Sequence, residues 1–331
     1  MYFGFTKCAK RLSWLMAHGC QQNGIGEMAV TANSDKLLSL IDRGAEVEQV
    51  ATGFAFTEGP IWNPKEKCLY FSDIPNDVRR RWSAADGDSV VREVSGNPAN
   101  KCNGMTLDGD LSLYICEHST SNLVRETAAG ERQVLASHFE GKELNSPNDV
   151  VVKSDGAVYF SDPTYGRMPV FGEERECQLD FQGVFRISPD GDLSCVADDY
   201  GQPNGLCFSP DESLLYINDT PRAHIRVYDV NIDGSLSNGR VFAENIGDGE
   251  LESGVVDGMK CDAEGNIIVT GPQGFWVFDP EGTHLGIIEM PEHSANLNWG
   301  GDNWDELYCT CTTSVYRVKM KISGNRLSYM T

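Results

Sequence analysis

One short sequence pattern recurs along this chain and limits the folds that it can adopt. Residues 144–152, LNSPNDVVV, end in an apolar run, and the turn Asp155-Gly156 separates it from a second run, VYFSD at 158–162. Copies of this order of polar residue, apolar run, turn, apolar run and acid begin at 58, 103, 148, 204, 257 and 295, the last copy being looser. The spacings of 45, 45, 56, 53 and 38 residues are typical of a β-propeller with one sheet per repeat.

Each of the first five copies divides into four predicted strands. These are 58–62, 68–72, 78–82 and 89–94; 103–107, 111–116, 122–126 and 131–135; 148–152, 157–161, 183–187 and 192–197; 204–208, 214–218, 224–230 and 239–243; and 257–261, 266–270, 274–278 and 284–289. The sixth copy has only three, 295–299, 306–311 and 314–320, and a spare strand is expected at 46–52, after a short helix within 32–43 capped by Asn33 or Ser34. The sequence therefore predicts an all-β fold, a six-bladed β-propeller whose last blade is closed by an N-terminal strand.

The composition favours a single acidic domain. With 40% hydrophobic and 23% charged residues the chain is ordinary for a globular protein, and repeats that cannot bury a face alone must form one ring. We expect this domain to span residues 31–331, after a poorly ordered extension over residues 1–30. The 27 basic and 49 acidic residues give a net charge of −22, which argues against nucleic acid as a partner. It also argues against an anionic membrane surface, and no apolar run reaches the ~20 residues that span a bilayer.

Cysteine usage bears on the compartment. The 11 cysteines are irregularly spaced without a CxxC pair, and Cys68, Cys116, Cys207 and Cys261 fall in predicted core strands. We interpret most of them as small buried hydrophobic residues in a reducing compartment. The N-terminus has no long apolar stretch or clear cleavage site, so we expect a cytoplasmic protein, with a weak N-terminal signal as the alternative.

Antiparallel order within each blade brings particular residues to one end of the ring. The start of the first strand, the end of the second and the start of the third share one face. The first positions of the copies lie there, near the central axis: Glu58, Asn103, Asn148, Asn204, Asp257 and Ala295. The ends of the second strands flank them: Asp73, Glu117-His118, Asp162 and Asp219. The insertion 163–182, in the third blade, must lie over the same mouth and is a candidate lid, with Tyr165 and Phe171 as possible pocket residues.

Two carboxylates and three carboxamides at one point form an oxygen-rich site. Any single Asn-Gly could instead serve a local turn. Five polar residues at equivalent places in consecutive repeats favour a hard divalent cation. We expect one such cation, with calcium preferred and magnesium, manganese, iron(II) or zinc as alternatives.

Several phrases together resemble a known family. They are Thr57-Glu58-Gly59-Pro60, Cys116-Glu117-His118, residues 144–152, Pro203-Asn204-Gly205-Leu206, Val256-Asp257-Gly258 and residues 312–317, TTSVYR. Over roughly residues 45–320 the chain resembles the SMP-30/gluconolactonase (regucalcin-like) family of six-bladed propellers, in its gluconolactonase-like branch.

The resemblance implies roles for individual residues. Glu58, Asn148, Asn204 and Asp257 match metal ligands of the family, and Asn103 matches a substrate-contacting asparagine. Lys101 stands where some members have a substrate-binding arginine, and Glu117 resembles an acid that holds sugar hydroxyls. His118 could contact substrate or serve the structure of the mouth.

The implied activity is metal-dependent hydrolysis of a sugar lactone in carbohydrate metabolism. The cation would polarise the ring carbonyl of an aldonolactone such as gluconolactone, and a water activated by the cation or by Asp257 would attack. One alternative is a hydrolase of organophosphates such as diisopropyl fluorophosphate at the same site. Another is a calcium-binding propeller without enzymatic activity. No G-x-S-x-G elbow supports a serine hydrolase.

Overall fold

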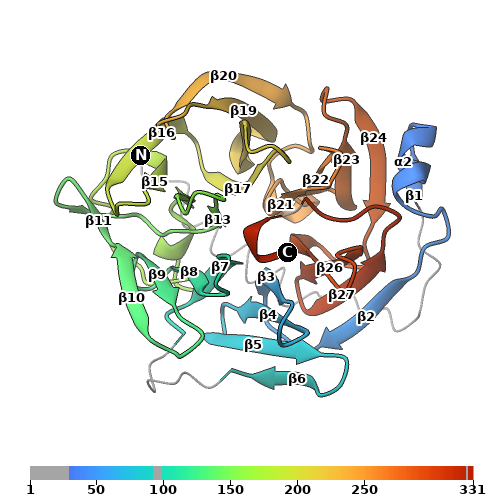
Figure 1. Ribbon diagram of the computed structural model, residues 1–331, viewed down its shortest axis with the longest axis horizontal. Helices are drawn as coiled ribbons and strands as arrows, with labels where there is room; N and C mark the ends of the chain where they lie inside the picture. Colours follow the sequence, from blue (N-terminus) through green and yellow to red (C-terminus); the bar gives the residue numbers. More distant parts are fainter. Residues whose placement is uncertain (1–29, 92–98, 326, 331) are drawn as a thin grey trace.

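The computed structural model describes residues 30–91, 99–325 and 327–330, and its strands form six sheets around a central axis (Figure 1). The first blade contains β3 Thr57–Asn63, β4 Cys68–Asp73, β5 Val78–Ser83 and β6 Gly87–Val90. The second contains β7 Cys102–Leu107, β8 Leu113–Glu117, β9 Asn122–Glu126 and β10 Arg132–Ala136. The third contains β13 Val150–Val152, β14 Val158–Asp162, β15 Gln182–Ile187 and β16 Leu193–Tyr200.

The remaining blades follow the same antiparallel order. The fourth contains β17 Pro203–Phe208, β18 Leu214–Asp219, β19 His224–Val230 and β20 Leu236–Ala243. The fifth contains β21 Met259–Cys261, β22 Ile267–Gly271, β23 Gly274–Phe278 and β24 His284–Glu289. The sixth contains β25 Ser294–Gly300, β26 Glu306–Cys311 and β27 Ser314–Lys319, and its fourth strand is β2 Val47–Thr52.

The ring is closed as the sequence predicts. Strand β2 pairs antiparallel with β27, with Val47 opposite Val318, and supplies the missing outer strand of the sixth blade. The innermost strands contact one another in the cyclic order β3, β7, β13, β17, β21, β25 and back to β3. The Trp62 and Tyr308 rings stack across the junction of the first and sixth blades, with centroids 5.1 Å apart. The prediction of six blades closed by an N-terminal strand is confirmed.

Smaller elements decorate this ring. Strand β1 Val30–Ala32 adds a fifth strand to the outer edge of the fifth blade, by pairing with β24. Helix α2 Asp35–Leu40 begins at the predicted cap Ser34, whose hydroxyl accepts the backbone N–H of Lys36. The other elements are the two-stranded β11 His138–Phe139 and β12 Lys142–Glu143 and the 3₁₀ turns η1 Tyr165–Arg167, η2 Thr220–Arg222, η3 Leu251–Ser253 and η4 Ser328–Met330.

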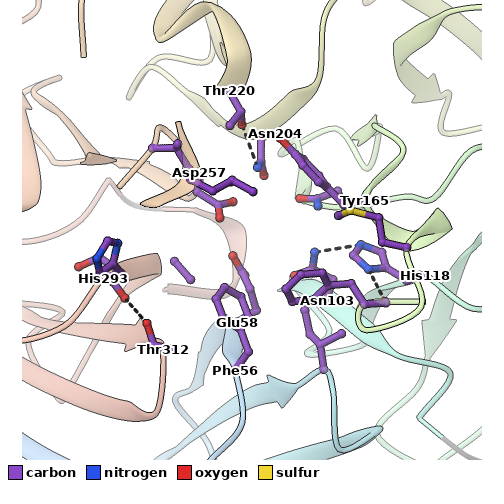
Figure 2. Close-up of a pocket in the computed structure, with 18 of the residues that line it drawn as sticks. Phe56, Glu58, Asn103, His118, Tyr165, Asn204, Thr220, Asp257, His293 and Thr312 are labelled. Atoms are coloured by element: carbon purple, nitrogen blue, oxygen red, sulfur yellow. Dashed lines mark hydrogen bonds between the residues drawn. The ribbon is translucent and has the colours of Figure 1, made fainter. Parts of the chain in front are cut away.

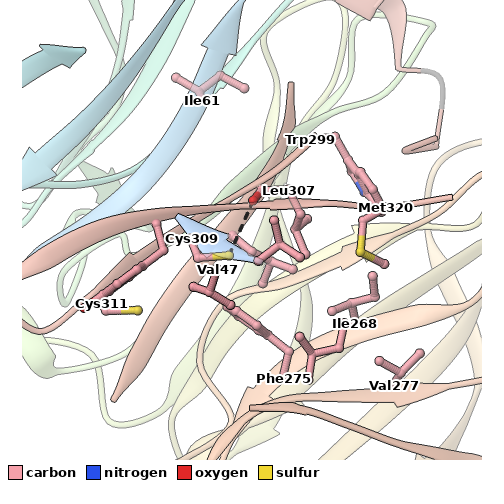
Figure 3. Packing of buried hydrophobic residues seen from close by; sticks show 14 of the residues in the cluster. Val47, Ile61, Ile268, Phe275, Val277, Trp299, Leu307, Cys309, Cys311 and Met320 are labelled. Atoms are coloured by element: carbon pink, nitrogen blue, oxygen red, sulfur yellow. Dashed lines mark hydrogen bonds between the residues drawn. The ribbon is translucent and has the colours of Figure 1, made fainter. Parts of the chain in front are cut away.

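Apolar side chains fill the space between blades. One cluster joins the first, second, fifth and sixth blades to α2, and Figure 3 shows Val47 of β2 packed near Leu307 and Cys309. Burying this apolar surface stabilises the closing strand beyond its backbone hydrogen bonds. The cysteines of the described residues are all free, including the four that we placed in core strands, which are buried. Within the same residues no helix is both long and apolar enough to cross a membrane.

The element boundaries differ from the predicted ones in a few places. The inner strands of the third and fifth blades begin at Val150 and Met259, two residues later than predicted. The outer strand β6, Gly87–Val90, begins two residues before the predicted 89–94, because the Ser83 hydroxyl and Asp86 close the preceding turn early. Residues 92–94 of that prediction lie outside the described residues. The predicted extension over residues 1–30 lies outside the described residues, apart from Val30, which begins β1.

Candidate active site

The starts of all six repeats line one cavity at one end of the propeller (Figure 2). Its polar lining includes Glu58, Asn103, Asn148, Asn204 and Asp257, and Ala295 occupies the equivalent place in the sixth blade. The cavity encloses about 900 Å³ of empty space, including its opening to solvent.

The glycine that follows the polar first residue in several repeats is required by a close contact between neighbouring blades. The N–H of Gly104 donates to the carbonyl of Asn148 at 2.8 Å, and that of Gly205 donates to the carbonyl of Asp257 at 3.0 Å. A β-carbon at either glycine would collide with the carbonyl oxygen that its own N–H binds. Close approach of backbones therefore requires glycine here, and it ties each cavity residue to the next blade.

Acids at the ends of three second strands hold the loops that lead into the cavity. Asp162 accepts the backbone N–H groups of Asn145 and Ser146 at 2.8 and 2.7 Å. Asp219 does the same for Gly201 and Gln202 at 2.8 and 3.0 Å. Asp73 accepts the N–H of Ala55 at 3.1 Å. In each case the held backbone lies two or three residues before a cavity residue, so these acids position the site without lining the cavity.

The Glu58 carboxylate is oriented from one side. Its Oε2 accepts hydrogen bonds from the backbone N–H of Gly59 and from Nδ2 of Asn296, the latter at 2.9 Å. Asn296 is fixed in turn, because its Oδ1 accepts the N–H of Leu297 at 2.8 Å. Glu58 thus keeps Oε1 for another partner, and in Figure 2 the carboxylate points toward Asp257.

A threonine orients the amide of Asn204. The Thr220 hydroxyl donates to the carbonyl of Val256 at 2.8 Å and accepts Nδ2 of Asn204 at 3.2 Å. This arrangement fixes which end of the amide is the nitrogen and directs Oδ1 of Asn204 away from Thr220. The backbone of Asp257 is held by its N–H to Thr270 Oγ1 at 2.7 Å and by Asn218 Nδ2 to its carbonyl at 2.6 Å.

The cavity floor concentrates negative charge. Burial, followed by repulsion from Asp149, raises the pKa of Glu58 to about 7. Burial, followed by repulsion from Glu58 and Asp149, raises the pKa of Asp257 well above its ordinary value. One cation faces this group, since Nζ of Lys260 lies 3.8 Å from Oδ2 of Asp149. A further cation among these carboxylates would relieve their repulsion.

The donor set fits a hard cation. Glu58, Asn148, Asn204 and Asp257 offer carboxylate and carboxamide oxygens, which suit calcium or magnesium better than softer metals. Over the described ranges no group of three or more His, Cys, Asp and Glu side chains forms a metal cluster. A cation bound here would therefore take amide oxygens among its ligands.

His118 links the insertion to the cavity wall. Its Nδ1 lies 2.9 Å from the carbonyl oxygen of Phe171, and its Nε2 lies 3.0 Å from Nδ2 of Asn103. Burial lowers the pKa of His118 to about 4, so the imidazole is neutral near pH 7. Oδ1 of Asn103 is buried without a hydrogen-bond partner in the described part of the chain.

The insertion 163–182 covers one side of the mouth, where the sequence places it. Tyr165, Met168 and Phe171 line the cavity, and Phe171 packs edge-to-face on Phe56 with ring centroids 5.2 Å apart. Hydrogen bonds fasten this segment to its surroundings, including those from Gly166 N–H to Ser146 Oγ at 2.9 Å and between Thr164 and Gln202. The insertion is therefore anchored as an apolar wall of the cavity.

Two predicted substrate-binding residues lie elsewhere. Nζ of Lys101 donates to the carbonyl of Pro75 at 2.7 Å, and Lys101 is not among the cavity residues. Glu117 is buried in a salt bridge with Arg132 and accepts a hydrogen bond from Thr120 at 2.7 Å. The structure thus brings Asn103 and His118 to the cavity, and Lys101 and Glu117 make their contacts outside it.

Sequence reasoning missed several residues that shape the site. Thr220 and Asn296 orient cavity residues, and His293 lines the cavity. The sixth repeat begins with the apolar Ala295, and Asn296 follows it in the inner strand. A polar amide at that position could have indicated a residue that faces the cavity ligands. Thr220 and His293 lie in loops whose paths the repeat does not define.

Comparison with known proteins identifies the family of this chain and several relatives. A family model for the SMP-30/gluconolactonase/LRE-like region matches residues 56–313. The gluconolactonase of Zymomonas mobilis is 31% identical over 318 residues, which cover 91% of this chain and 89% of that protein. The pentonolactonase of Haloferax volcanii is 28% identical, covering 79% and 83%.

A solved structure agrees with these sequence relatives. The structure described as a gluconolactonase of Xanthomonas campestris has a TM-score of 0.78 and 28% identity, covering 91% of this chain and 99% of that one. The region that the family model matches, residues 56–313, includes every cavity residue named above. The chain belongs to the SMP-30/gluconolactonase/LRE-like family.

Proposed function

We propose that this protein hydrolyses a sugar lactone, an aldonolactone of the gluconolactone type, to its aldonic acid with the help of one divalent cation. The observation that carries the proposal is the convergence of two carboxylates, the buried Glu58 and the half-buried Asp257, with amide oxygens on one cavity. Relatives named gluconolactonase and pentonolactonase support a sugar lactone as the substrate class.

Glu58, Asn148, Asn204 and Asp257 would hold the cation, with calcium favoured by the all-oxygen set. When bound, the cation supplies a Lewis acid that polarises the lactone carbonyl and stabilises the developing oxyanion. Thr220 and Asn296 keep Asn204 and Glu58 in place, which reduces the reorganisation that binding would need.

Asp257 would be the proton acceptor. Its carboxylate lies on the cavity opposite Glu58 (Figure 2), where it can take a proton from the water that attacks the lactone carbonyl. As the ring C–O bond breaks, the same proton can pass to the departing ring oxygen, which becomes the hydroxyl of the aldonic acid. The ionised carboxylate is then restored.

The opposite walls would select and shield the substrate. Asn103 offers a polar group to the sugar, and apolar side chains of the insertion and its neighbours limit the access of water. These side chains are Phe56, Ile74, Met168, Phe171 and Leu251, which pack on one another and line the cavity.

Substitution of the proton acceptor tests this assignment. We expect Asp257→Ala to lower kcat for gluconolactone by about 10³-fold or more, since it removes both a general base and a ligand. Asp302→Ala, at an exposed acid paired with Lys67, serves as the matched control and should keep wild-type activity. Full activity of Asp257→Ala, with an unchanged circular dichroism spectrum, would contradict the mechanism.

A further inference from the structure

We propose that His118 is a positioning residue that turns the oxygen of Asn103 toward the cavity, so that the site recognises a hydroxyl group of its substrate at this point. The inference rests on the proposed function, because it names which lactones that site would accept.

The contacts of His118 define its tautomer. The carbonyl oxygen of Phe171 can only accept, so Nδ1 of His118, 2.9 Å away, must carry the hydrogen. The neutral ring then has a lone pair on Nε2, which can only accept. The atom of Asn103 facing it at 3.0 Å is therefore the amide nitrogen, a donor. This network assigns both the tautomer of His118 and the orientation of the Asn103 amide.

The surroundings leave the imidazole little freedom. His118 is 1% exposed, and its ring packs against Gly166 of the insertion, where a β-carbon would collide with it. Gly166 is itself fixed through its N–H to Ser146 Oγ at 2.9 Å. The insertion thus holds His118 through both a hydrogen bond and packing, and His118 holds Asn103.

Because the amide nitrogen of Asn103 faces His118, its Oδ1 faces away from the imidazole. Oδ1 of Asn103 has no partner in the described part of the chain, although Asn103 is only 3% exposed and lines the cavity with Glu58 and Asp257. A buried acceptor of this kind requires a donor from a ligand or a water. Among candidate substrates, a sugar lactone has hydroxyl donors, whereas an unsubstituted lactone or an organophosphate triester has only acceptors. The orientation of Asn103 therefore favours the hydroxylated lactone.

The tautomer can be measured without any assay of activity. Long-range ¹H–¹⁵N correlation spectra of histidine-labelled protein at pH 7 distinguish the two neutral tautomers and the imidazolium, and the His118 signals are those missing from His118→Gln. We expect the Nδ1–H tautomer. An Nε2–H tautomer or an imidazolium would overturn the inference, whether or not the protein hydrolyses lactones.

Two substitutions then separate the roles of the ring nitrogens. In His118→Gln the side-chain oxygen can take the place of Nε2 and accept from Asn103, whereas in His118→Asn the amide nitrogen can take the place of Nδ1 and donate to Phe171. We measure kcat/KM for gluconolactone and for δ-valerolactone, which has no hydroxyl groups.

We expect His118→Gln to keep most of the wild-type preference for gluconolactone and His118→Asn to lose about tenfold of it, the effect of one neutral hydrogen bond. An unchanged preference in His118→Asn, or an equal loss in both variants, would overturn the positioning role. If the wild type hydrolyses neither lactone, the proposed function fails, and the tautomer measurement still decides whether His118 orients Asn103.

Discussion

Thr220 shows how a residue outside the ligand set can decide the geometry of a ligand. Its hydroxyl hydrogen is donated to the carbonyl of Val256, so the hydroxyl oxygen can only accept a hydrogen bond from Nδ2 of Asn204. Oδ1 of Asn204 is then free to face the cavity. Asn296 does the same for Glu58. Residues of this kind commonly control metal affinity as strongly as weak ligands do.

We therefore expect Thr220→Val to weaken the binding of calcium by about 10–100-fold while the fold is kept, because valine has the same shape without the hydroxyl. Thr106→Val, at a buried threonine of β7 that is not among the residues lining this cavity, is the control. Calorimetric titration of calcium into the chelator-treated variants measures the difference. Equal affinities in the two variants would show that Thr220 does not position Asn204.

His118 also makes a prediction about pH. Its pKa is about 4 in the folded protein, against 6.5 ordinarily, because burial disfavours the charged ring. Between these values the unfolded chain binds more protons, so stability must fall as pH is lowered from 6.5 toward 4, by up to about 3 kcal/mol. Denaturant unfolding of wild type and His118→Gln at pH 7 and 5 measures this. The wild type should lose more stability than the variant; an equal loss would contradict the assignment.

Residues of the site could be predicted from the sequence where their position in the repeat determines their position in the fold. Glu58, Asn103, Asn148, Asn204 and Asp257 could be brought together because each begins a repeat and repeats are related by the ring. The contacts of Lys101 and Glu117 could not be predicted in this way. Lys101 binds the carbonyl of Pro75, in a loop, and Glu117 binds Arg132, in an outer strand, and the repeat does not define the path of either segment.

At the scale of elements, the inner strands are joined by hydrogen bonds between blades. Gly104, Gly205 and Gly258 each donate to the carbonyl of the cavity residue, or its equivalent, in the next blade. The carbonyls of Asn148 and Asp257, which lie just before the inner strands of the third and fifth blades, are thus bound by a neighbouring blade. The alternation of apolar residues predicts strands that pair within one sheet, but it does not predict hydrogen bonds between neighbouring blades. The number of strands per blade was therefore predictable from the sequence, whereas the first residue of some inner strands was not.

Gly205 provides the test at this scale. We expect Gly205→Ala to destabilise the protein by about 1–3 kcal/mol, because the added methyl group collides with the Asp257 carbonyl, and to weaken calcium binding as Asp257 shifts. Gly44→Ala is the matched control, since no atom lies within 4 Å of its β-carbon position, and it should stay within about 0.5 kcal/mol of wild type. Equal thermal and calcium-binding behaviour of the two variants would refute the proposed close contact.

The whole molecule combines a closed scaffold with a strongly acidic chain. Ring closure by β2 leaves the outer edge of the sixth blade paired, and the six inner strands bring side chains from distant parts of the sequence within one cavity. The net charge of −22 attracts cations and repels anions, including the aldonic acid that hydrolysis would release. A cation site at the axis is thus consistent with both the shape and the charge of the protein.

The most direct test of the central claim is lactone hydrolysis before and after removal of divalent cations. The chelator-treated protein is assayed with a pH indicator over a panel of aldonolactones and with diisopropyl fluorophosphate, and calcium, magnesium, manganese, iron(II) and zinc are then added back separately. We predict that chelation abolishes hydrolysis of an aldonolactone and that one cation, calcium in the first place, restores it. Tight cation binding without turnover of any lactone, or full activity in the chelated protein, would contradict the account.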